Sequence, residues 1–528
     1  MPLAERRIAL RVLQAGGLAV VIATTPYKTF DLDRFFVPKE LVLCITALVV
    51  ALLCTARAKR ISLSRADQLL ALWLLLSTVS AVFATNQWLA GRAVAVSLAG
   101  AACFWCARGL ARAGHARALV AALALAGIIG AGTALLQAYG MKTEFVSLNR
   151  APGGTFGNRN FMAHLCVIAL PALLFSGLRA PSRASLARWC GGIAIVTGAL
   201  ILSRSRAAWL ALVVGLIVLT MAGILALRRA DGSLSASRLL VLFVAAGAGA
   251  GAALAMPNTL DWNSNSPYAD TAQGIVNYKG GSGHGRLIQY GNSLRMTLRH
   301  PLLGVGPGNW PVIYPRFASE SDPSLGRDGM TSNPWPSSDW VAFLSERGPV
   351  ALVLLGLTVL ALLIDGLRGL RDSTGTEARC SVAVLLATLV VLLIVGAFDA
   401  VLLLPVPALV GWSLLGALAA PSRERWTIEM TAPRRIAALV CVAAVGGLVV
   451  ARSGAQLMAM SIYATSSRAS ALERASAIDP GSYRIHARLG QLYLGRGDCK
   501  RAKVHASAAK RQFPSSPAAR RLLASCGG

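Results

Sequence analysis

Hydrophobic residues recur in long runs along the chain, and short polar segments separate these runs up to about residue 452. Thirteen runs are long and apolar enough to be candidate membrane-spanning helices. They lie at approximately residues 8–24, 38–56, 67–84, 93–111, 117–139, 160–178, 189–203, 207–227, 239–256, 349–366, 380–398, 400–420 and 436–452. The pattern predicts an all-α polytopic membrane protein with about 12–13 transmembrane helices.

The net charge of the chain is +29, from 52 Lys and Arg against 23 Asp and Glu. Such a charge raises nucleic acid as a partner, but its distribution argues otherwise. Basic residues gather in alternate segments between the runs, for example at Arg6, Arg7, Arg57 and Arg60, and the intervening short segments hold far fewer. This is the positive-inside pattern of membrane proteins. We therefore expect contact with membrane lipids, a cytoplasmic N-terminus and no nucleic-acid partner.

With that topology the chain divides into four regions. Residues 1–256 hold the N-terminal transmembrane helices, and residues 348–452 hold the C-terminal ones. Residues 257–347 form a long loop and residues 453–528 a tail, both on the outer side of the membrane. The stretch SRSRAAWLAL, which begins at Ser203, is an outer turn that places Arg204 and Arg206 between two apolar runs.

The long outer loop has the composition of a folded segment. It is rich in aromatic residues, which a linker would lack, and its acidic and basic residues balance. Apolar positions from Arg286 to Leu298 follow helical spacing, so the loop is expected to be partly helical. The stretch HPLLGVGPGNW, residues 300–310, ends that helix at Pro301 and turns through its glycines.

The tail follows the 34-residue tetratricopeptide pattern. Its small and large residues fall at the expected offsets, at Leu489, Gly490, Tyr493, Ala502, Ala509 and Pro514. One and a half repeats are too few for a solenoid, so this helical hairpin is expected to lean on the rest of the chain or on a protein partner. The tail holds twelve Lys and Arg against three Asp and Glu, which indicates either a solvated basic face or an attraction to anionic lipid or glycan.

The ten cysteines form no metal-binding pattern, and we predict no metal site. Most of them lie in or beside the apolar runs, where cysteine behaves as a small apolar residue. Cys499 and Cys526 lie in the tail, and an oxidising compartment would permit a disulfide there. The sequence leaves their pairing open.

Several stretches together resemble one family. The motifs are GGTFGNRNFMAHL (residues 153–165), the Ser-Arg turn, the helix that begins near Arg286, and HPLLGVGPGNW, and they occur in this order. The chain resembles the bacterial O-antigen ligase and O-antigen polymerase superfamily over about residues 150–420. HPLLGVGPGNW is the most specific of these motifs.

The resemblance implies an inner-membrane glycosyltransferase, with its long loop and tail in the periplasm. Members of that family transfer a glycan from undecaprenyl pyrophosphate to an acceptor hydroxyl, without a metal or another cofactor. The acceptor is a lipopolysaccharide core sugar, another lipid-linked glycan or a protein. The sequence leaves the acceptor, the sugar and the oligomeric state open.

The resemblance also assigns residues. Arg206 and Arg286 match the family's pyrophosphate-binding arginines, and Arg204 is a possible third. Guanidinium groups suit this task because their planar fork makes paired hydrogen bonds to phosphate oxygens. Further residues that the motifs bring to the site as structural or lining groups are Arg159, Asn160, Gly304, Gly306 and Asn309.

The chain departs from the family at one position. The family carries a histidine just before the span that follows the loop, and this chain has Ser337 there, in SSDWVAFLSERG. Three interpretations are open: Asp339 or Glu346 serves as the base, His284 substitutes for the histidine, or the protein is an inactive relative. The last would make it a scaffold for polysaccharide assembly that works through its tail. A lipid or polysaccharide transporter is a further alternative, but we find no internal repeat or charge in mid-membrane that would favour it.

Overall fold

The computed structural model describes residues 3–146, 150–227, 235–275, 281–326, 328–373 and 375–527. Helices make up nearly all of its regular structure, and the two short strands form a single antiparallel pair. The predicted fold class is therefore confirmed.

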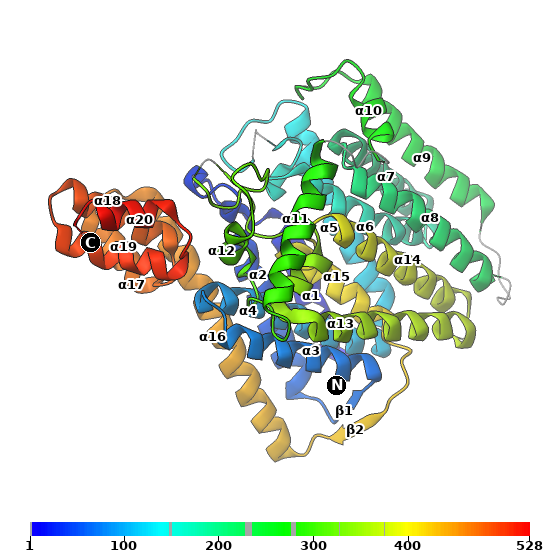
Figure 1. Ribbon diagram of the computed structural model, residues 1–528. Coiled ribbons are helices and arrows are strands. Elements are labelled where there is room, and N and C mark those ends of the chain that lie inside the picture. The colour runs from blue at the N-terminus through cyan, green and yellow to red at the C-terminus, as the bar shows by residue number, and fades with distance from the viewer. Residues whose placement is uncertain are drawn as a thin grey trace. The chain divides into compact units, whose positions relative to one another are not determined.

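In the described part of the chain, a helix covers most or all of each of the thirteen predicted runs (Figure 1). These helices are α1 (Leu3–Ile22), α2 (Asp33–Ala56), α3 (Arg65–Val82), α4 (Gln87–Leu110), α5 (Ala116–Ala138), α6 (Arg159–Leu178), α7 (Arg183–Ser203), α8 (Arg206–Leu227), α9 (Ala236–Ala255), α13 (Asp339–Asp372), α14 (Thr376–Phe398), α15 (Pro405–Leu418) and α16 (Ala432–Thr465). The remaining elements belong to the loops and the tail.

Length and composition allow ten helical segments of the described chain to cross a membrane. One of these segments, residues 87–138, contains both α4 and α5. The apolar helix α15 is shorter than predicted, because Pro405 starts it and prolines favour the first turn of a helix. Conversely, α13 begins ten residues before the predicted span and breaks at Gly348, where φ is 85°.

The chain forms two compact units. Unit 1 comprises Met1–Leu70, Leu98–Val276 and Leu357–Leu448. Unit 2 comprises Ala71–Ser97, Asn277–Gly356 and Val449–Gly528. The long outer loop and the tail thus share unit 2, whereas the Ser-Arg turn and the first part of the loop belong to unit 1.

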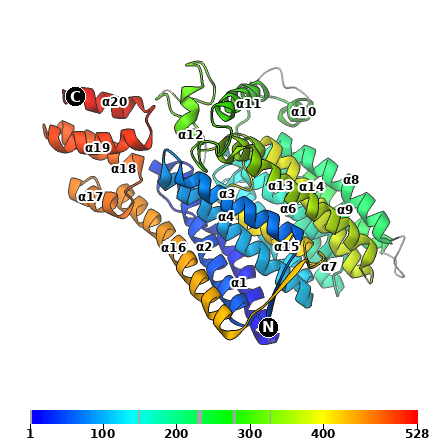
Figure 2. The same ribbon diagram turned by 60° about the horizontal axis from the view of Figure 1, so that its bottom comes forward.

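The core of unit 1 is a bundle of helices that run side by side (Figures 1 and 2). Nearly every residue of α6 is buried, and α5, α7, α8 and α14 pack against it. On α8 and α9, by contrast, large apolar side chains are exposed, for example Val213, Ile217, Leu240 and Val244. Exposed apolar faces of this extent are typical of helices that contact lipid.

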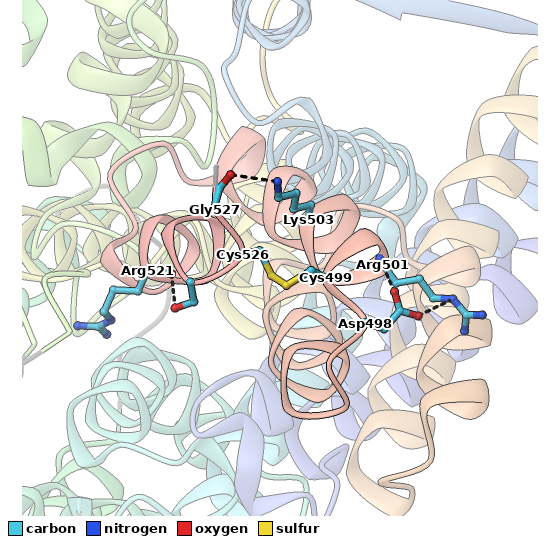
Figure 3. The surroundings of a disulfide bond; sticks show 8 residues. Asp498, Cys499, Arg501, Lys503, Arg521, Cys526 and Gly527 are labelled. Carbon is cyan, nitrogen blue, oxygen red and sulfur yellow. Dashed lines mark hydrogen bonds and ion pairs between the residues drawn. A yellow bond between two sulfur atoms is a disulfide. The ribbon is translucent and has the colours of Figure 1, made fainter.

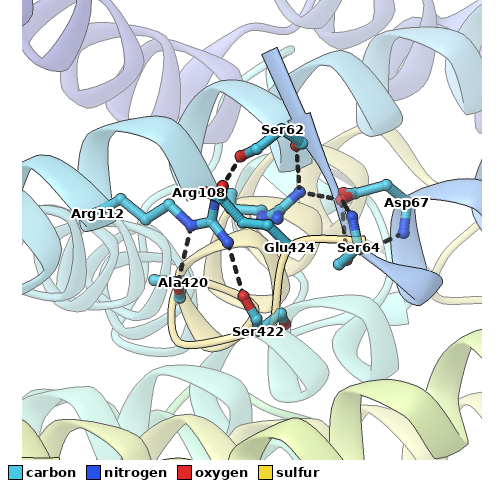
Figure 4. Close-up of polar contacts among 8 residues, drawn as sticks. All are labelled: Ser62, Ser64, Asp67, Arg108, Arg112, Ala420, Ser422 and Glu424. Carbon is cyan, nitrogen blue, oxygen red and sulfur yellow. Dashed lines mark hydrogen bonds and ion pairs between the residues drawn. The ribbon is translucent and has the colours of Figure 1, made fainter. Parts of the chain in front are cut away.

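A polar cluster in unit 1 joins the start of α3, the end of α4 and the residues that follow α15 (Figure 4). The strands β1 (Arg60–Leu63) and β2 (Trp426–Glu429) pair there, with Arg60 opposite Glu429. Arg108 forms a buried ion pair with Asp67, and Arg112 donates to the carbonyl oxygens of Ala420 and Ser422 at 2.9 and 2.8 Å. These arginines lie in a segment that the charge pattern assigns to the cytoplasm, and here they also hold the structure.

The outer loop in unit 2 has a hydrophobic core of its own. Its helices are α11 (Gly281–Arg299), α12 (Trp310–Ile313) and the single turn η5 (Tyr314–Arg316), and the shorter helix α10 (Pro267–Gln273) precedes them in unit 1. Met296, Trp310 and Tyr314 are fully buried against one another. The expectation of an ordered, partly helical loop is confirmed.

The tail consists of α17 (Ala469–Ile478), α18 (Tyr483–Gly495), α19 (Cys499–Gln512) and α20 (Pro517–Ala524). The repeat positions Leu489, Tyr493 and Ala502 are buried together, as the tetratricopeptide pattern requires. Cys499 and Cys526 form a disulfide that joins the start of α19 to the residues after α20 (Figure 3).

Within unit 2 the tail leans on the outer loop. Phe513, at the end of α19, packs against the loop core that contains Trp310. The Asn86 side chain, in the turn between α3 and α4, donates to the carbonyl oxygen of Gln512 at 3.4 Å. The short repeat therefore finds within its own chain part of the support that it lacks alone.

Candidate functional site: a cationic cavity beside the Ser-Arg turn

The Ser-Arg turn is a tight connection between α7 and α8. Arg204 caps α7 in the left-handed conformation, with φ 52° and ψ 31°. The Ser203 hydroxyl accepts a hydrogen bond from the Ser205 backbone N–H at 3.3 Å and donates to the carbonyl of Leu200 at 2.6 Å. The two serines thus shape the turn, and the two arginines leave it on either side of Ser205.

Both arginines of the turn bind the segment around α10. Arg204 Nε donates to the Thr271 hydroxyl at 2.9 Å, and Arg206 Nη1 donates to the carbonyl oxygen of Gly274 at 2.9 Å. The guanidinium group of Arg206 lies directly beside Gly274 and leaves no space there for a side chain. Arg206 therefore anchors the backbone of this segment.

A cavity of about 540 Å³ lies beside the turn in unit 1. Its lining includes three cations, Lys142, Arg159 and Arg204, and one acid, Asp261. Arg159 is the first residue of α6, and the Asn158 side chain caps this helix by accepting from the Asn160 N–H at 3.0 Å. The remaining lining residues are Gln137, Ala151, Thr259, Leu260, Trp262 and Asn263.

Trp262 joins the two guanidinium groups of the cavity. The Cζ atoms of Arg159 and Arg204 lie 4.9 and 4.7 Å from the centroid of its ring. Like charges repel, so two arginines gathered on one indole need attractive contacts, and the π electrons of the ring provide them. The cavity therefore presents two preorganised cations around an aromatic platform.

Backbone contacts hold the platform in place. The Thr259 N–H and hydroxyl both donate to the carbonyl oxygen of Ala138, the last residue of α5, at 2.8 and 3.0 Å. The Asn258 side chain accepts from the Leu260 N–H at 3.1 Å. Trp262 thus follows a segment that is tied to the end of α5.

The electrostatics of the cavity favour an anion. Burial lowers the pKa of Arg204, the nearby Arg206 lowers it further, and Asp270 and Tyr268 act in the opposite direction. A negatively charged ligand would favour the charged form of this guanidinium group and offset part of the cost of its burial. The cavity is thus suited to a compact anion such as a phosphate or pyrophosphate.

The structure distributes the residues predicted for the site between the two units. Arg159 and Arg204 line the cavity, whereas Arg206 anchors α10 and is not among the lining residues. Asn160 donates to the Asp399 carboxylate at 3.5 Å. Arg286 and His284 lie on α11 in unit 2, so their joint action with the Ser-Arg turn stays a prediction.

Within unit 2, the structure brings the Ser337 position to α11. The Ser337 N–H donates to the side chain of Gln289 at 2.6 Å, and its carbonyl oxygen accepts from the Tyr290 hydroxyl at 2.6 Å. Gln289 and Tyr290 lie about one helical turn after Arg286. His284 is exposed on the same helix. The residue at the expected histidine position therefore contacts α11 about one turn after Arg286.

The Glu346 carboxylate holds the turn of HPLLGVGPGNW. It is fully buried, and its oxygens accept from the backbone N–H groups of Gly308 and Trp310 at 2.9 and 3.2 Å. Gly304 and Gly306 both have positive φ, and a Cβ atom at either position would lie within 2.5 Å of neighbouring atoms. These contacts give Glu346 a structural task, and its catalytic role remains a prediction.

Asn309 is a second anchor of this turn. Its side chain accepts from the Asn86 N–H at 2.7 Å and donates to the Asn86 carbonyl oxygen at 3.0 Å. Asp339, the first residue of α13, is fully buried as well. In the described part of the chain, no group of three His, Cys, Asp or Glu side chains could hold a metal ion.

Three charged or aromatic residues of the cavity were not predicted from the sequence: Lys142, Asp261 and Trp262. None of them belongs to a motif that we recognised, and Trp262 stood out only as one of many aromatic residues in the outer loop. Their position beside Arg159 and Arg204 follows from the way the loops return to the helix ends, which no local pattern reveals.

The comparisons with known proteins identify two regions of the chain. Residues 191–356 match the family model described as O-antigen ligase, and residues 469–526 match the model described as tetratricopeptide repeat. A search of curated proteins with the sequence gives no match. The matched regions contain the Ser-Arg turn, Asp261, Trp262, α11 and the tail helices. This multi-pass membrane protein thus carries a domain of the O-antigen ligase family and a C-terminal tetratricopeptide repeat.

Proposed function

We propose that this protein transfers a glycan from undecaprenyl pyrophosphate to an acceptor hydroxyl, and that the cationic cavity of unit 1 holds the pyrophosphate. One observation carries the proposal: Arg159 and Arg204 flank Trp262 in a cavity that also contains Lys142. The family of residues 191–356 supports the same reaction type.

The chemistry of the transfer explains the need for these cations. Negative charge develops on the bridging oxygen as the bond from C1 of the sugar to the pyrophosphate breaks. Fixed guanidinium groups stabilise this charge more in the transition state than in the ground state, which lowers the barrier. The protein needs no other cofactor for this step, because the pyrophosphate is already a good leaving group.

The remaining arginines have separate tasks in the proposal. Arg206 holds α10 through Gly274 and so shapes the approach to the cavity. For Arg286, on α11, the resemblance implies a role in donor binding. Asp339 and Glu346 then act in the outer loop as buried structural acids rather than as bases.

The site would face the periplasm of a bacterial inner membrane. The alternation of basic segments supports this orientation. The Cys499–Cys526 disulfide supports it independently, since such bonds persist in oxidising compartments. The donor lipid would then reach the cavity from the bilayer, and the acceptor glycan, lipopolysaccharide core or protein would come from the periplasm.

A second candidate function is a scaffold in polysaccharide assembly that binds the donor without transferring its glycan. Ser337 at the expected histidine position favours it, because a serine hydroxyl is a poor proton acceptor. In this reading the tail, packed against the outer loop, would recruit a protein partner.

Expression in a host that lacks its own ligase and polymerase distinguishes these functions. The unmutated protein should attach glycan to an acceptor, whereas Arg159→Gln and Arg204→Gln should each reduce the product at least tenfold, measured from the glycan profile on a gel. Arg299→Gln changes an exposed arginine of the outer loop and should leave the product unchanged.

Two further variants test the arginines that the resemblance assigns. Arg206→Ala and Arg286→Ala should also lower the yield. Wild-type yield in both variants would remove these arginines from the mechanism, and wild-type yield in Arg159→Gln and Arg204→Gln would exclude the cavity as the donor site. Absence of product from the unmutated protein would favour the scaffold.

A further inference from the structure

We infer that Asp261 is the catalytic base, which accepts the proton of the attacking acceptor hydroxyl. The inference rests on the proposed glycan transfer and names the group that the reaction requires on the acceptor side. Asp261 is the one acid among the residues that line the cationic cavity, and it directly precedes the Trp262 platform.

The position of Asp261 leaves its carboxylate available. The residue is exposed, and in the part of the chain that the structure describes its side chain forms no hydrogen bond or ion pair. Its backbone, however, is fixed, because the preceding Thr259 is tied to the end of α5 by two hydrogen bonds. A free carboxylate on a fixed segment suits a group that must meet a substrate.

The two acids that the sequence suggests as bases, Asp339 and Glu346, are placed differently. Both oxygens of Glu346 already accept backbone N–H groups, and Asp339 is fully buried. Neither acid lines the cationic cavity. Asp261 therefore combines two features that those acids lack: access to solvent and a position beside the cations that would hold the donor.

The reaction balances with Asp261 in this role. The acceptor oxygen forms a bond to C1 of the donor sugar, and its proton passes to the Asp261 carboxylate. The bond between C1 and the bridging oxygen breaks, and its electron pair stays with the pyrophosphate. Asp261 afterwards returns the proton to water. The cations stabilise the leaving group while the carboxylate removes the proton, so opposite charges act on the two sides of one carbon.

Trp262 supplies a further sign that a polar ligand enters the cavity. Its indole nitrogen is buried and has no hydrogen-bond acceptor among the described residues. Buried donors are normally satisfied, and one that is not calls for an explanation. A sugar hydroxyl or phosphate oxygen bound between Arg159 and Arg204 would provide the missing acceptor, next to the carboxylate of Asp261.

The test compares Asp261→Asn and Asp261→Glu in the purified full-length protein in lipid nanodiscs. The first measurement is binding of inorganic pyrophosphate. Asn removes a negative charge from the cavity, so Asp261→Asn should bind pyrophosphate about three- to tenfold more tightly than the unmutated protein. Glu320→Gln, which removes an exposed acid of the outer loop, is the matched control and should leave the affinity unchanged.

The second measurement is the rate of transfer from a glycan linked to undecaprenyl pyrophosphate, with rough lipopolysaccharide or the same lipid-linked glycan as acceptor. Asp261→Asn should lower kcat by about 10²- to 10⁴-fold, the usual contribution of a general base, whereas Asp261→Glu should recover part of the rate. Glu320→Gln should transfer at the unmutated rate.

The two measurements separate the possible failures. Tighter binding together with slower transfer supports the inference, because a merely structural role would not move them in opposite directions. Undiminished transfer by Asp261→Asn would overturn the inference and leave the proposed function standing, and so would slower transfer with unchanged pyrophosphate binding. No transfer by the unmutated protein with either acceptor would overturn the proposed function and the inference together.

Discussion

Arg204 has an unusual backbone for an arginine. Its φ of 52° lies in the left-handed region, which costs a residue with a side chain about 1–2 kcal/mol. Glycine would occupy this position without that cost. The chain nevertheless has an arginine there, and its guanidinium group reaches Trp262 and the cavity. We interpret the strained conformation as the cost of placing a cation at this point.

A histidine pair in the tail makes the stability of the tail depend on pH. His486 Nε2 donates to the carbonyl oxygen of Pro480 at 3.1 Å, so in the neutral ring Nδ1 is an acceptor, 3.0 Å from Nδ1 of His505. Burial lowers the pKa of His486, and the neighbouring charges of His505 and Arg511 act in the same direction, against the Pro480 carbonyl and Glu473. A second proton on His486 would set two N–H groups against each other.

The tail should therefore lose stability as the pH falls. The unfolded state takes up a proton on this histidine near pH 6.5, whereas the folded state resists protonation. Below that pH the unfolded state therefore binds more protons and becomes more stable relative to the folded state. Hydrogen exchange of the α18 and α19 amides, corrected for the intrinsic rates, should speed up progressively from pH 7.5 to 5.5.

His486→Gln should flatten this pH dependence, because glutamine does not titrate and its amide can still donate to Pro480. His284→Gln, at an exposed histidine of the outer loop, should preserve it. Corrected exchange rates in the tail that stay constant between pH 7.5 and 5.5 would show that protonation of His486 does not destabilise the tail.

The sequence predicts some of the individual residues of the site. The motifs single out Arg159 and Arg204, and both line the cavity. They also rank Arg206 above Arg204, whereas the structure gives the cavity position to Arg204. Lys142, Asp261 and Trp262 come from loops without a motif, because their proximity depends on how the loops fold back, and a family pattern reports only what its members share.

Among the elements, the turn of HPLLGVGPGNW shows how a buried acid can serve the structure. Glu346 lies on α13, two residues before the break at Gly348. Its carboxylate accepts hydrogen bonds from the backbone N–H groups of Gly308 and Trp310 on the turn. The turn also donates a backbone hydrogen bond to the same helix: the Gly306 N–H donates to the Glu346 carbonyl oxygen at 2.8 Å. This part of α13 therefore supports the turn from one side, and Asn86 supports it through Asn309.

Glu346→Gln should loosen this turn. Glutamine offers one acceptor oxygen in place of two and sets its NH₂ group against a backbone N–H. Hydrogen bonds to a charged group contribute about 1.5–3 kcal/mol, so the free energy of opening of the turn should fall by about 2 kcal/mol, measured by hydrogen exchange at residues 304–310. Glu320→Gln again provides the control. Slower glycan transfer with unchanged exchange in Glu346→Gln would instead favour Glu346 as the base.

The elements themselves follow closely from the periodicity of the sequence, but their ends do not. A helix lies at each of the long apolar runs, because a helix buried in lipid requires an uninterrupted apolar stretch. The polar start of α13 at Asp339 escapes this rule, since its residues pack against protein instead of lipid. The extension of α16 to Thr465 escapes it for the same reason: its last turns reach the tail core around Ala459.

In the whole molecule, the cationic cavity and most of the outer loop belong to different units. Unit 1 contains the cationic cavity with Asp261, and unit 2 contains α11, the Ser337 position and the tail. The large positive charge has at least two uses beyond topology: Arg108 and Arg112 fasten the helix ends, and Arg159 and Arg204 line the cavity. Net charge alone predicts neither use, because it carries no information on position.

We propose above all that the cavity binds the pyrophosphate of the donor lipid. Equilibrium binding of labelled undecaprenyl pyrophosphate to the purified protein in nanodiscs tests it most directly, with Arg204→Gly and Arg159→Gln as variants. Glycine suits the φ of residue 204, so that variant removes the cation with little cost to the turn. We predict at least tenfold weaker binding in each variant and unchanged binding in Arg299→Gln. Wild-type affinity in both Arg204→Gly and Arg159→Gln would show that the pyrophosphate binds elsewhere.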